Sequence, residues 1–221
     1  MRRVFVLVVI VGLASPAVAL PPDIGARVVL AARELVGVKY RLGGRLRAKS
    51  EGIDCQGLIF YSLQRISRCG YRSYSLNPTE SVAWRELGSP VAGLAPASTL
   101  SFDRSLLRPG DVIFLLAPSR NPREPALTTL DGTPQWVWHT GLSTDGGAWL
   151  HADYTTGYVR EEDLRGFLVK NGYAGVFVLR MDKGPAPRGC KPHAPMKRPP
   201  TSSATRTRQG GQVRRSPAGE L

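Results

Sequence analysis

The order of helical and strand-like patterns along the chain constrains its fold most. Apolar residues recur at helical spacing in the first half, over residues 22–36, 55–68 and 78–87. Short runs of β-branched and aromatic residues, bounded by Gly and Pro, follow at 111–116, 137–143, 148–152 and 175–181. Helices followed by strands are typical of an α+β fold, and we expect N-terminal helices packed on a short antiparallel β-sheet.

The two ends of the 221-residue chain differ from its middle. Arg2 and Arg3 precede an apolar run that ends in Ala17-Val18-Ala19, which is typical of a signal peptide over residues 1–19. The run is too short to cross a membrane, so we expect cleavage near Ala19 and export to the periplasm or the extracellular space. We predict one domain over residues 20–183 and a disordered, basic, Pro-rich tail over residues 184–221.

The positive charge is concentrated outside the predicted domain. The chain has a net charge of +13, but residues 184–221 alone hold eight Lys and Arg against one Glu. After subtraction of this tail and the leader, residues 20–183 carry only about +4, which argues against a nucleic-acid-binding domain. The tail is either a solvated extension or an attachment to anionic wall polymers or a membrane surface. We expect a monomer.

The three cysteines are Cys55, Cys69 and Cys190, and none forms a C-x-x-C motif. This number and spacing exclude a thiol-rich zinc module and a dense disulfide scaffold. In an oxidising compartment, cysteines pair unless one is kept apart for chemistry. We therefore expect Cys55 to be free, with Cys69 and Cys190 either joined in a disulfide or separated by a disordered tail.

Cys55 lies where a Gly-rich loop meets the strongest helical pattern, in the sequence Gly-Ile-Asp-Cys-Gln-Gly at 52–57. We expect Asp54 to cap the helix and Cys55 to be its first residue. The positive end of the helix dipole would then stabilise a nucleophilic thiolate. Gly57 would let another part of the backbone approach closely. The alternative is an inert, buried cysteine.

Two histidines occupy successive predicted strands, His139 and His151, separated by a Thr-Asp-Gly-Gly hairpin signal at 144–147. If the loop centres on Asp145, the two histidines lie directly opposite each other, with Cβ atoms roughly 5 Å apart. A thiol, a base and a group that orients the base form a triad for nucleophilic catalysis. We therefore predict a Cys55–His139–His151 triad.

A zinc site formed by the same three side chains is the competing interpretation. It lacks a neighbouring carboxylate or a second cysteine at ligand spacing, so we expect neither metal nor cofactor. Residues 117–135 form a predicted long loop that is either surface decoration or a rim over the cleft, with Trp136 as its apolar contribution.

Four motifs in order carry a resemblance to a known family: Tyr-Arg-Leu-Gly-Gly at 40–44, Asp-Cys-Gln-Gly at 54–57, Leu-Arg-Pro-Gly-Asp-Val-Ile-Phe at 107–114, and His-Thr-Gly at 139–141 followed by Leu-His-Ala at 150–152. Together they resemble the NlpC-type cell-wall cysteine peptidases of the papain-like superfamily, over about residues 24–181. The resemblance implies a papain-like α+β fold. It also implies cleavage of peptidoglycan stem peptides between D-glutamate and a diamino acid.

The resemblance also implies individual roles. Cys55 would be the nucleophile, His139 the base and His151 the group that orients the base. Tyr40 would line the site and support the oxyanion hole, and Asp54 would contact a free amine of the substrate. Gln56 stands where the family usually has Ser, so the substrate contact at this position is expected to differ.

Three other functions remain open on the same sequence. The triad could serve a peptidoglycan amidase that cleaves the sugar–peptide linkage, or an acyltransferase. A non-catalytic wall-binding module with a structural Cys55 is the third.

Overall fold

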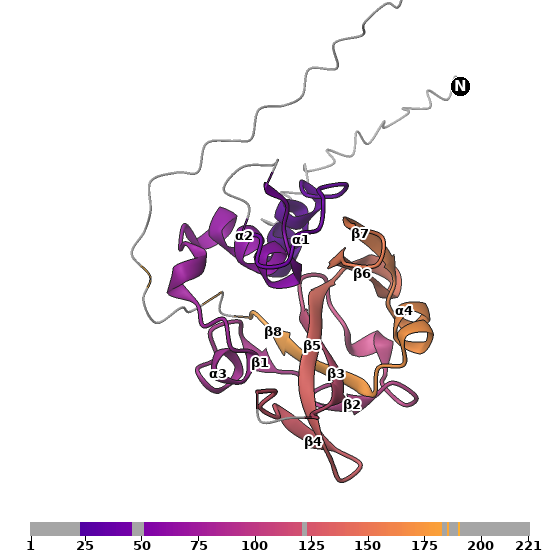
Figure 1. Cartoon of the computed structure of the whole chain (residues 1–221). Helices are drawn as coiled ribbons and strands as arrows, with labels where there is room; N and C mark the ends of the chain where they lie inside the picture. Colours follow the sequence, from indigo (N-terminus) through magenta and orange to yellow (C-terminus); the bar gives the residue numbers. More distant parts are fainter. Residues whose placement is uncertain (1–22, 46–50, 121–122, 183–184, 186–189, 191–221) are drawn as a thin grey trace, which may run out of the picture.

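A computed structural model describes residues 23–45, 51–120, 123–182, 185 and 190 of the protein (Figure 1). The predicted leader, its cleavage site and the tail apart from Pro185 and Cys190 lie outside the described residues. Within the described ranges, no helix has both the length and the apolar character that crossing a bilayer requires.

Helices and one antiparallel sheet make up the domain (Figure 1). The strands lie in the order β1-β8-β3-β5-β6-β7, while β2 also pairs with β8 and β4 with β5. The α+β fold predicted from the element order is therefore confirmed. The helices are α1 (Ile24–Arg33), α2 (Cys55–Ser67), α3 (Pro78–Ala83) and α4 (Leu164–Asn171). The strands are β1 (Ser89–Pro90), β2 (Ala97–Ser98), β3 (Val112–Pro118), β4 (Thr128–Leu130), β5 (Thr133–Ser143), β6 (Ala148–Asp153), β7 (Tyr158–Asp163) and β8 (Gly175–Arg180).

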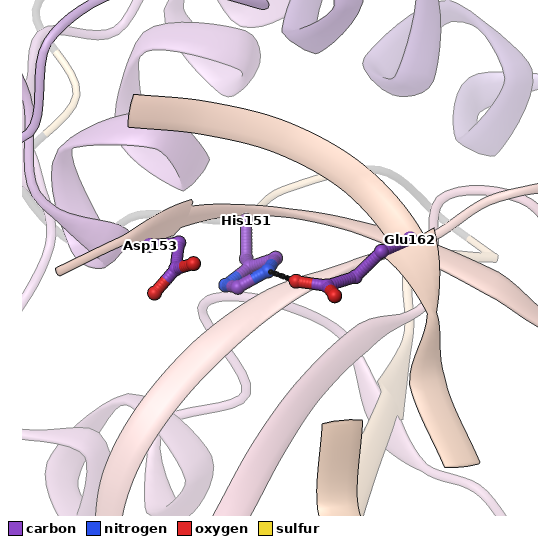
Figure 2. Close-up of side chains that lie close together, drawn as sticks. All are labelled: His151, Asp153 and Glu162. Carbon is purple, nitrogen blue, oxygen red and sulfur yellow. Dashed lines mark hydrogen bonds and ion pairs between the residues drawn. The ribbon is translucent and has the colours of Figure 1, made fainter. Parts of the chain in front are cut away.

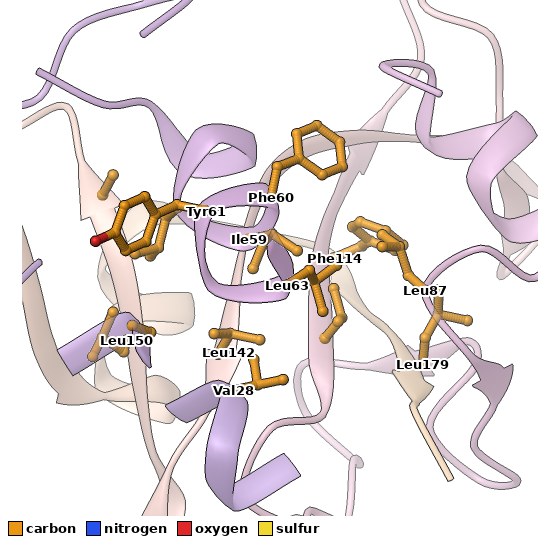
Figure 3. Close-up of a cluster of buried hydrophobic side chains, with 14 of the residues drawn as sticks. Val28, Ile59, Phe60, Tyr61, Leu63, Leu87, Phe114, Leu142, Leu150 and Leu179 are labelled. Carbon is orange, nitrogen blue, oxygen red and sulfur yellow. The ribbon is translucent and has the colours of Figure 1, made fainter. Parts of the chain in front are cut away.

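Strand β3 lies at the centre of the hydrophobic core because both of its faces are buried. On one face Phe114 joins a cluster with residues of α1 and α2, part of which Figure 3 shows. On the other face Leu115 joins a second cluster that includes Trp149 of β6 and Phe167 of α4. Burial of a Leu or Phe side chain stabilises a fold by about 1.5–3 kcal/mol, so one cluster holds α1 and α2 against one face of the sheet and the other holds α4 against the opposite face.

The prediction of one long loop over residues 117–135 is wrong. Residues 128–130 form β4, which pairs with the first residues of β5 in a tight hairpin. Asp131 and Gly132 form the turn and both have positive φ, 50° and 75°. An Asp-Gly pair is a hairpin signal because type I′ turns need positive φ at both central residues.

Strand β7 and helix α4 were not predicted from the sequence. Strand β7 lies at the edge of the sheet, with alternating burial and a charged centre of Arg160, Glu161 and Glu162, so it lacks an apolar run. Helix α4 has only 8 residues and relies on its caps. Asp163 accepts a hydrogen bond from the Gly166 N–H at its start, and Gly172 ends it with a φ of 66°.

Cys69, just after α2, forms a disulfide with Cys190, and their Cα atoms are 5.3 Å apart. Among the described residues, Cys55 is the free cysteine. Both observations confirm the first of the two alternatives for the thiols. Cys190 also packs against the core, so a residue beyond position 183 is bonded to the domain.

Candidate active site

The start of α2 has the predicted arrangement. The Asp54 carboxylate accepts a hydrogen bond of 2.7 Å from the Gly57 N–H, which makes Asp54 the helix cap and Cys55 the first helical residue. A Cβ atom at Gly57 would collide with the carbonyl oxygen of Gly44. Glycine at this position therefore lets the Gly-rich loop pack directly on the helix.

The side chains of Asp54 and Gln56 both have partners within the protein. The second carboxylate oxygen of Asp54 accepts a hydrogen bond from the Gly43 N–H at 2.9 Å and forms an ion pair of 2.5 Å with Arg45. The amide oxygen of Gln56 accepts a hydrogen bond from Arg45 at 3.2 Å, and its NH2 group donates to the Leu76 carbonyl at 2.8 Å. Arg45 thus links the two residues on either side of Cys55.

A cleft of about 640 Å³ brings Cys55 and His139 together, although they are 84 positions apart in the chain. Most of its walls are apolar or aromatic, and Tyr40 lies among them as predicted. Trp136 also lines the cleft, which favours the rim interpretation of its segment over surface decoration. The full lining is Tyr40, Leu42, Asp54, Cys55, Gln56, Leu76, Pro78, Phe114, Trp136, Val137, Trp138, His139, Thr140 and Tyr154.

A β-bulge positions His139 in this cleft. His139 pairs with Leu115 of β3, but the next paired residue of β3, Leu116, lies opposite Val137, so Trp138 is the extra residue of β5. The Trp138 side chain is 57% exposed beside the cleft, whereas His139 is buried. Bulges commonly redirect side chains next to active sites, and this one separates a buried imidazole from an exposed indole.

The predicted register of the β5–β6 hairpin is wrong, although the predicted contact between the histidines is confirmed. Leu142 pairs with Leu150, which centres the hairpin on Gly146 rather than Asp145. Gly146 has a φ of 68° within a short 3-10 turn, and this lengthens the loop. His139 and His151 are therefore diagonal neighbours, and a shift of two residues keeps both on one face. The His139 Nε2 and His151 Nδ1 atoms are 2.8 Å apart.

Both imidazoles are held in an aromatic environment. The Trp149 ring stacks on His151 with a centroid distance of 4.1 Å, and Phe167 meets the same ring edge-on at 4.7 Å. Burial lowers the pKa of His139 to about 3 and that of His151 to about 3. Both rings are therefore neutral near pH 7, and each has one donor and one acceptor nitrogen.

The environment of Cys55 differs from the expected stabilised thiolate. Burial and the nearby Asp54 carboxylate raise the pKa of the Cys55 thiol to about 11. Hydrogen bonds from the backbone N–H groups of Thr140 and Gln56 oppose this rise, but they do not outweigh it. Desolvation thus opposes the stabilisation of a thiolate that the helix N-terminus provides.

Sequence reasoning missed the third partner in this network, Glu162 of β7. Its carboxylate oxygen Oε1 lies 2.9 Å from His151 Nε2 (Figure 2). Arg160 Nε lies 3.3 Å from the same oxygen. Glu162 was missed because β7 was not predicted. The segment is Tyr-Val-Arg-Glu-Glu-Asp, and its four consecutive charged residues carry no strand periodicity.

Within the described ranges, one set of side chains is close enough to share a metal ion: His151, Asp153 and Glu162, whose candidate ligand atoms lie within 4.8 Å of one another (Figure 2). It differs from the Cys55–His139–His151 set considered from the sequence. Arg160 already pairs with Glu162 and lies 3.9 Å from an Asp153 oxygen. Its guanidinium supplies positive charge where a cation would lie, so we assign no metal to this set.

No family model matches the sequence, and no curated protein matches it. Solved structures do match the fold. An N-acetylmuramoyl-L-alanine amidase from Bacteroides uniformis has a TM-score of 0.51 at 14% identity, over 71% of this chain and 98% of that one. The fold is shared. At this identity the likeness shows the fold alone, and it fits the expected α+β, papain-like architecture.

Two further structures are similar at lower TM-scores. The NlpC/p60 domain of peptidoglycan hydrolase SagA has a TM-score of 0.44 at 20% identity, over 71% of this chain and 98% of that one. NlpC2 from Trichomonas vaginalis has a TM-score of 0.49 at 17% identity, over 73% of this chain. The chain spans about half of that protein, 48% of its length.

Proposed function

We propose that the protein is an exported cysteine peptidase that hydrolyses amide bonds in peptidoglycan stem peptides, between D-glutamate and a diamino acid. The observation that carries the proposal is one cleft lined by Cys55 and His139, in which His139 is hydrogen-bonded to His151 at 2.8 Å. The substrate class rests on the four motifs that resemble NlpC-type peptidases and on the fold shared with an N-acetylmuramoyl-L-alanine amidase.

The pKa shifts favour general-base catalysis over a resting ion pair. The raised pKa of the Cys55 thiol and the lowered pKa of the His139 imidazole both mean that burial favours the neutral thiol and the neutral imidazole. The Cys55 proton would pass to His139 as the sulfur attacks the carbonyl carbon, which avoids a buried charge pair before the substrate is bound. His151 would hold the His139 ring in place during this transfer.

The remaining steps follow from the same groups. Attack of Cys55 creates a tetrahedral oxyanion, which the backbone N–H of Cys55 in the first turn of α2 and the Tyr40 hydroxyl would stabilise. His139 then donates its proton to the leaving amine, and the C–N bond breaks to leave a thioester. His139 next takes a proton from water, which attacks the thioester and releases the acid and the Cys55 thiol.

Asp54 remains the proposed contact for a free amine, but the site requires an exchange. Because Asp54 already pairs with Arg45, an incoming ammonium group would share or replace that ion pair. Gln56 is held by Arg45 and the Leu76 carbonyl, so its contact with substrate would also follow movement of Arg45. We therefore expect Arg45 to influence selection of the substrate amine.

An amidase that cleaves the sugar–peptide linkage is the second candidate. The exposed aromatic side chains Trp138 and Tyr154 at the cleft favour it, at 57% and 54% exposure, because flat rings can pack on a sugar. An acyltransferase would use the same thioester, with another nucleophile in place of water.

Digestion of purified sacculi separates these candidates. The peptidase should create a free amino group on the diamino acid and a free carboxyl group on D-glutamate, as read by mass spectrometry. The amidase should instead release intact stem peptides, and the acyltransferase should produce newly acylated amines. No release by the wild-type protein would support a non-catalytic wall-binding module.

Cys55→Ala is the decisive variant. The rate of Cys55 alkylation in the wild type measures the reactivity of the thiol independently. The variant should release nothing while its thermal unfolding remains close to that of the wild type. Release by Cys55→Ala at the wild-type rate would refute the nucleophile assignment.

The leader and the tail add two proposals about location. We propose export through residues 1–19, and attachment of the basic tail to anionic polymers of the wall or a membrane surface. A chain that stops after Cys190 keeps the disulfide and removes seven Lys and Arg. If the tail binds sacculi, this truncation should weaken co-sedimentation at low salt; equal sedimentation would exclude the idea.

A further inference from the structure

We propose that Glu162 is a positioning residue that extends the triad into a chain of four groups, Cys55–His139–His151–Glu162, and sets the tautomer of both imidazoles. This inference rests on the proposed function for its catalytic meaning. Its structural content, the direction of the hydrogen bonds, can be measured without any substrate.

Glu162 reaches His151 by the same diagonal geometry that joins the two histidines. In the β6–β7 ladder, His151 pairs with Arg160 and Trp149 pairs with Glu162, so Glu162 lies one diagonal from His151 on the same face. Figure 2 shows the Glu162 side chain directed at His151, and the two atoms are 2.9 Å apart. Side chains from β5, β6 and β7 thus form one continuous network.

A carboxylate at the end of this network determines the direction of every hydrogen bond in it. An ionised carboxylate only accepts, so His151 must carry its proton on Nε2 and donate it to Glu162. The Nδ1 atom of neutral His151 then has a lone pair, which accepts the Nε2–H of His139 across 2.8 Å. This leaves the lone pair of His139 on Nδ1, as a base for the Cys55 proton needs.

The reverse direction would disable the base. If His151 carried its proton on Nδ1, it would donate to His139 Nε2, and neutral His139 would then hold its own proton on Nδ1. His139 could then no longer accept the Cys55 proton at Nδ1. A neutral chain of imidazoles has no preferred direction of its own, so the acceptor-only group at its end makes the choice.

The surroundings of Glu162 act on its charge in opposite directions. Burial raises the pKa of Glu162 above its usual value, and the positive charge of Arg160, 3.3 Å away, only partly offsets this rise. Asp153 and Asp163 add negative charge around Glu162, and Lys170 adds positive charge. The carboxylate is 24% exposed, whereas the His151 side chain is fully buried. Solvent and Arg160 thus stabilise the charge at the outer end of the chain.

The rings cannot readily turn to an alternative arrangement. Trp149 stacks on His151 at an angle of 11° between planes, and Phe167 meets the same ring edge-on at 4.7 Å. His151 is therefore held in one orientation by packing, while Glu162 selects which nitrogen carries the proton. Packing alone does not distinguish the two tautomers, so Glu162 has a separate role.

The test compares Glu162→Gln with Glu161→Gln in the full chain. Glutamine keeps the size of glutamate but can also donate a hydrogen bond, so it no longer imposes one direction. Glu161 is the neighbouring residue of β7 and pairs with Arg33 at 2.8 Å, outside the cleft and the histidine network. Glu162→Met is the second variant. The amide oxygen of Gln can still accept a hydrogen bond from His151, whereas Met has no carboxylate or amide oxygen.

Two readouts are required. The kcat for amide hydrolysis should fall about 10- to 100-fold in Glu162→Gln and at least as much in Glu162→Met, with KM nearly unchanged because Glu162 does not line the cleft. Glu161→Gln should stay within about twofold of the wild type. The 15N spectrum of labelled histidines should show a protonated Nε2 on His151 and His139 in the wild type, and mixed tautomers in Glu162→Gln.

Each outcome has a distinct meaning. Folded Glu162 variants with the kcat of Glu161→Gln, or with unchanged tautomers, would overturn the inference. Lower thermal stability with unchanged kcat would assign Glu162 a structural role only and would overturn it as well. If the wild type cleaves no wall peptide but the spectra show the expected tautomers and their loss in Glu162→Gln, the proposed function fails and the positioning role stands.

Discussion

The two halves of the candidate site are built in different ways. The nucleophile half lies at the start of α2, where Asp54 caps the helix through a hydrogen bond to a residue three positions away. The base half takes His139, His151 and Glu162 from three different strands, β5, β6 and β7. Local hydrogen bonds thus position the sulfur, whereas strand register positions the imidazoles.

This difference predicts different responses to change. A helix start is specified by a few consecutive residues, so a substitution there acts over a short range. In a sheet, one change of register moves every side chain of a strand. Changes in the base half should therefore reach all three strands, whereas changes around α2 should act locally.

The largest effect should come from His139→Ala. Without a base, the raised pKa of the Cys55 thiol leaves little thiolate near neutral pH, and kcat should fall by about 10³-fold or more. The measurement is release of stem-peptide fragments from sacculi, with circular dichroism as the folding control. A rate within about tenfold of the wild type would show that the two halves do not act together.

The disulfide supports the nucleophile half, because Cys69 directly follows α2. A double Cys69→Ser, Cys190→Ser variant opens a link across 121 positions and should lose about 2–5 kcal/mol of unfolding free energy. The measurement is urea unfolding of the wild type and the variant, both without a reducing agent. Equal stability would show that the end of α2 is held by its core contacts alone.

Asp54→Ala tests how local the nucleophile half is. It removes a helix cap and leaves Arg45 without its ion-pair partner, and should cost about 1–3 kcal/mol of unfolding free energy. Asp23→Ala is the matched control, since Asp23 caps α1 through a 2.7 Å hydrogen bond to the Ala26 N–H on the exposed surface. The Asp54 variant should be the less stable of the two in thermal unfolding. A larger loss for Asp23→Ala would contradict the role given to Arg45.

The base half should also show a pH dependence of its stability. Burial lowers the pKa of His139 and His151 below the ordinary value of 6.5, so the unfolded chain binds protons there that the native chain does not. The unfolding free energy should therefore decrease as pH falls from about 6.5 towards 3, by up to about 1.4 kcal/mol per pH unit for each histidine.

His151→Gln isolates this contribution, because the carboxylates that also titrate are common to both proteins. Between pH 6.5 and 4.5 the variant should lose stability less steeply than the wild type, as measured by urea unfolding at several pH values. The same slope in both proteins would mean that His151 gains no protons on unfolding in this range.

Much of the fold could be predicted because its strongest elements carry local signals. Helix α2 has an apolar face and a cap, and the strands around residues 112–116, 137–143, 148–152 and 175–180 are apolar runs between turns. Strand β7 and helix α4 could not be recognised in this way. An edge strand with a charged centre and a helix of 8 residues depend on the sheet beside them.

The sequence by itself determined where the free thiol lies, at the first position of α2 behind the Asp54 cap, because helix starts depend on neighbouring residues. Only the tertiary structure decided how the imidazoles meet. A loop centred on Gly146 made His139 and His151 diagonal neighbours, and strand β7 added Glu162 to them. Strand pairing joins residues that are distant in the chain, so its register and its outermost partner are settled by packing and turn geometry together.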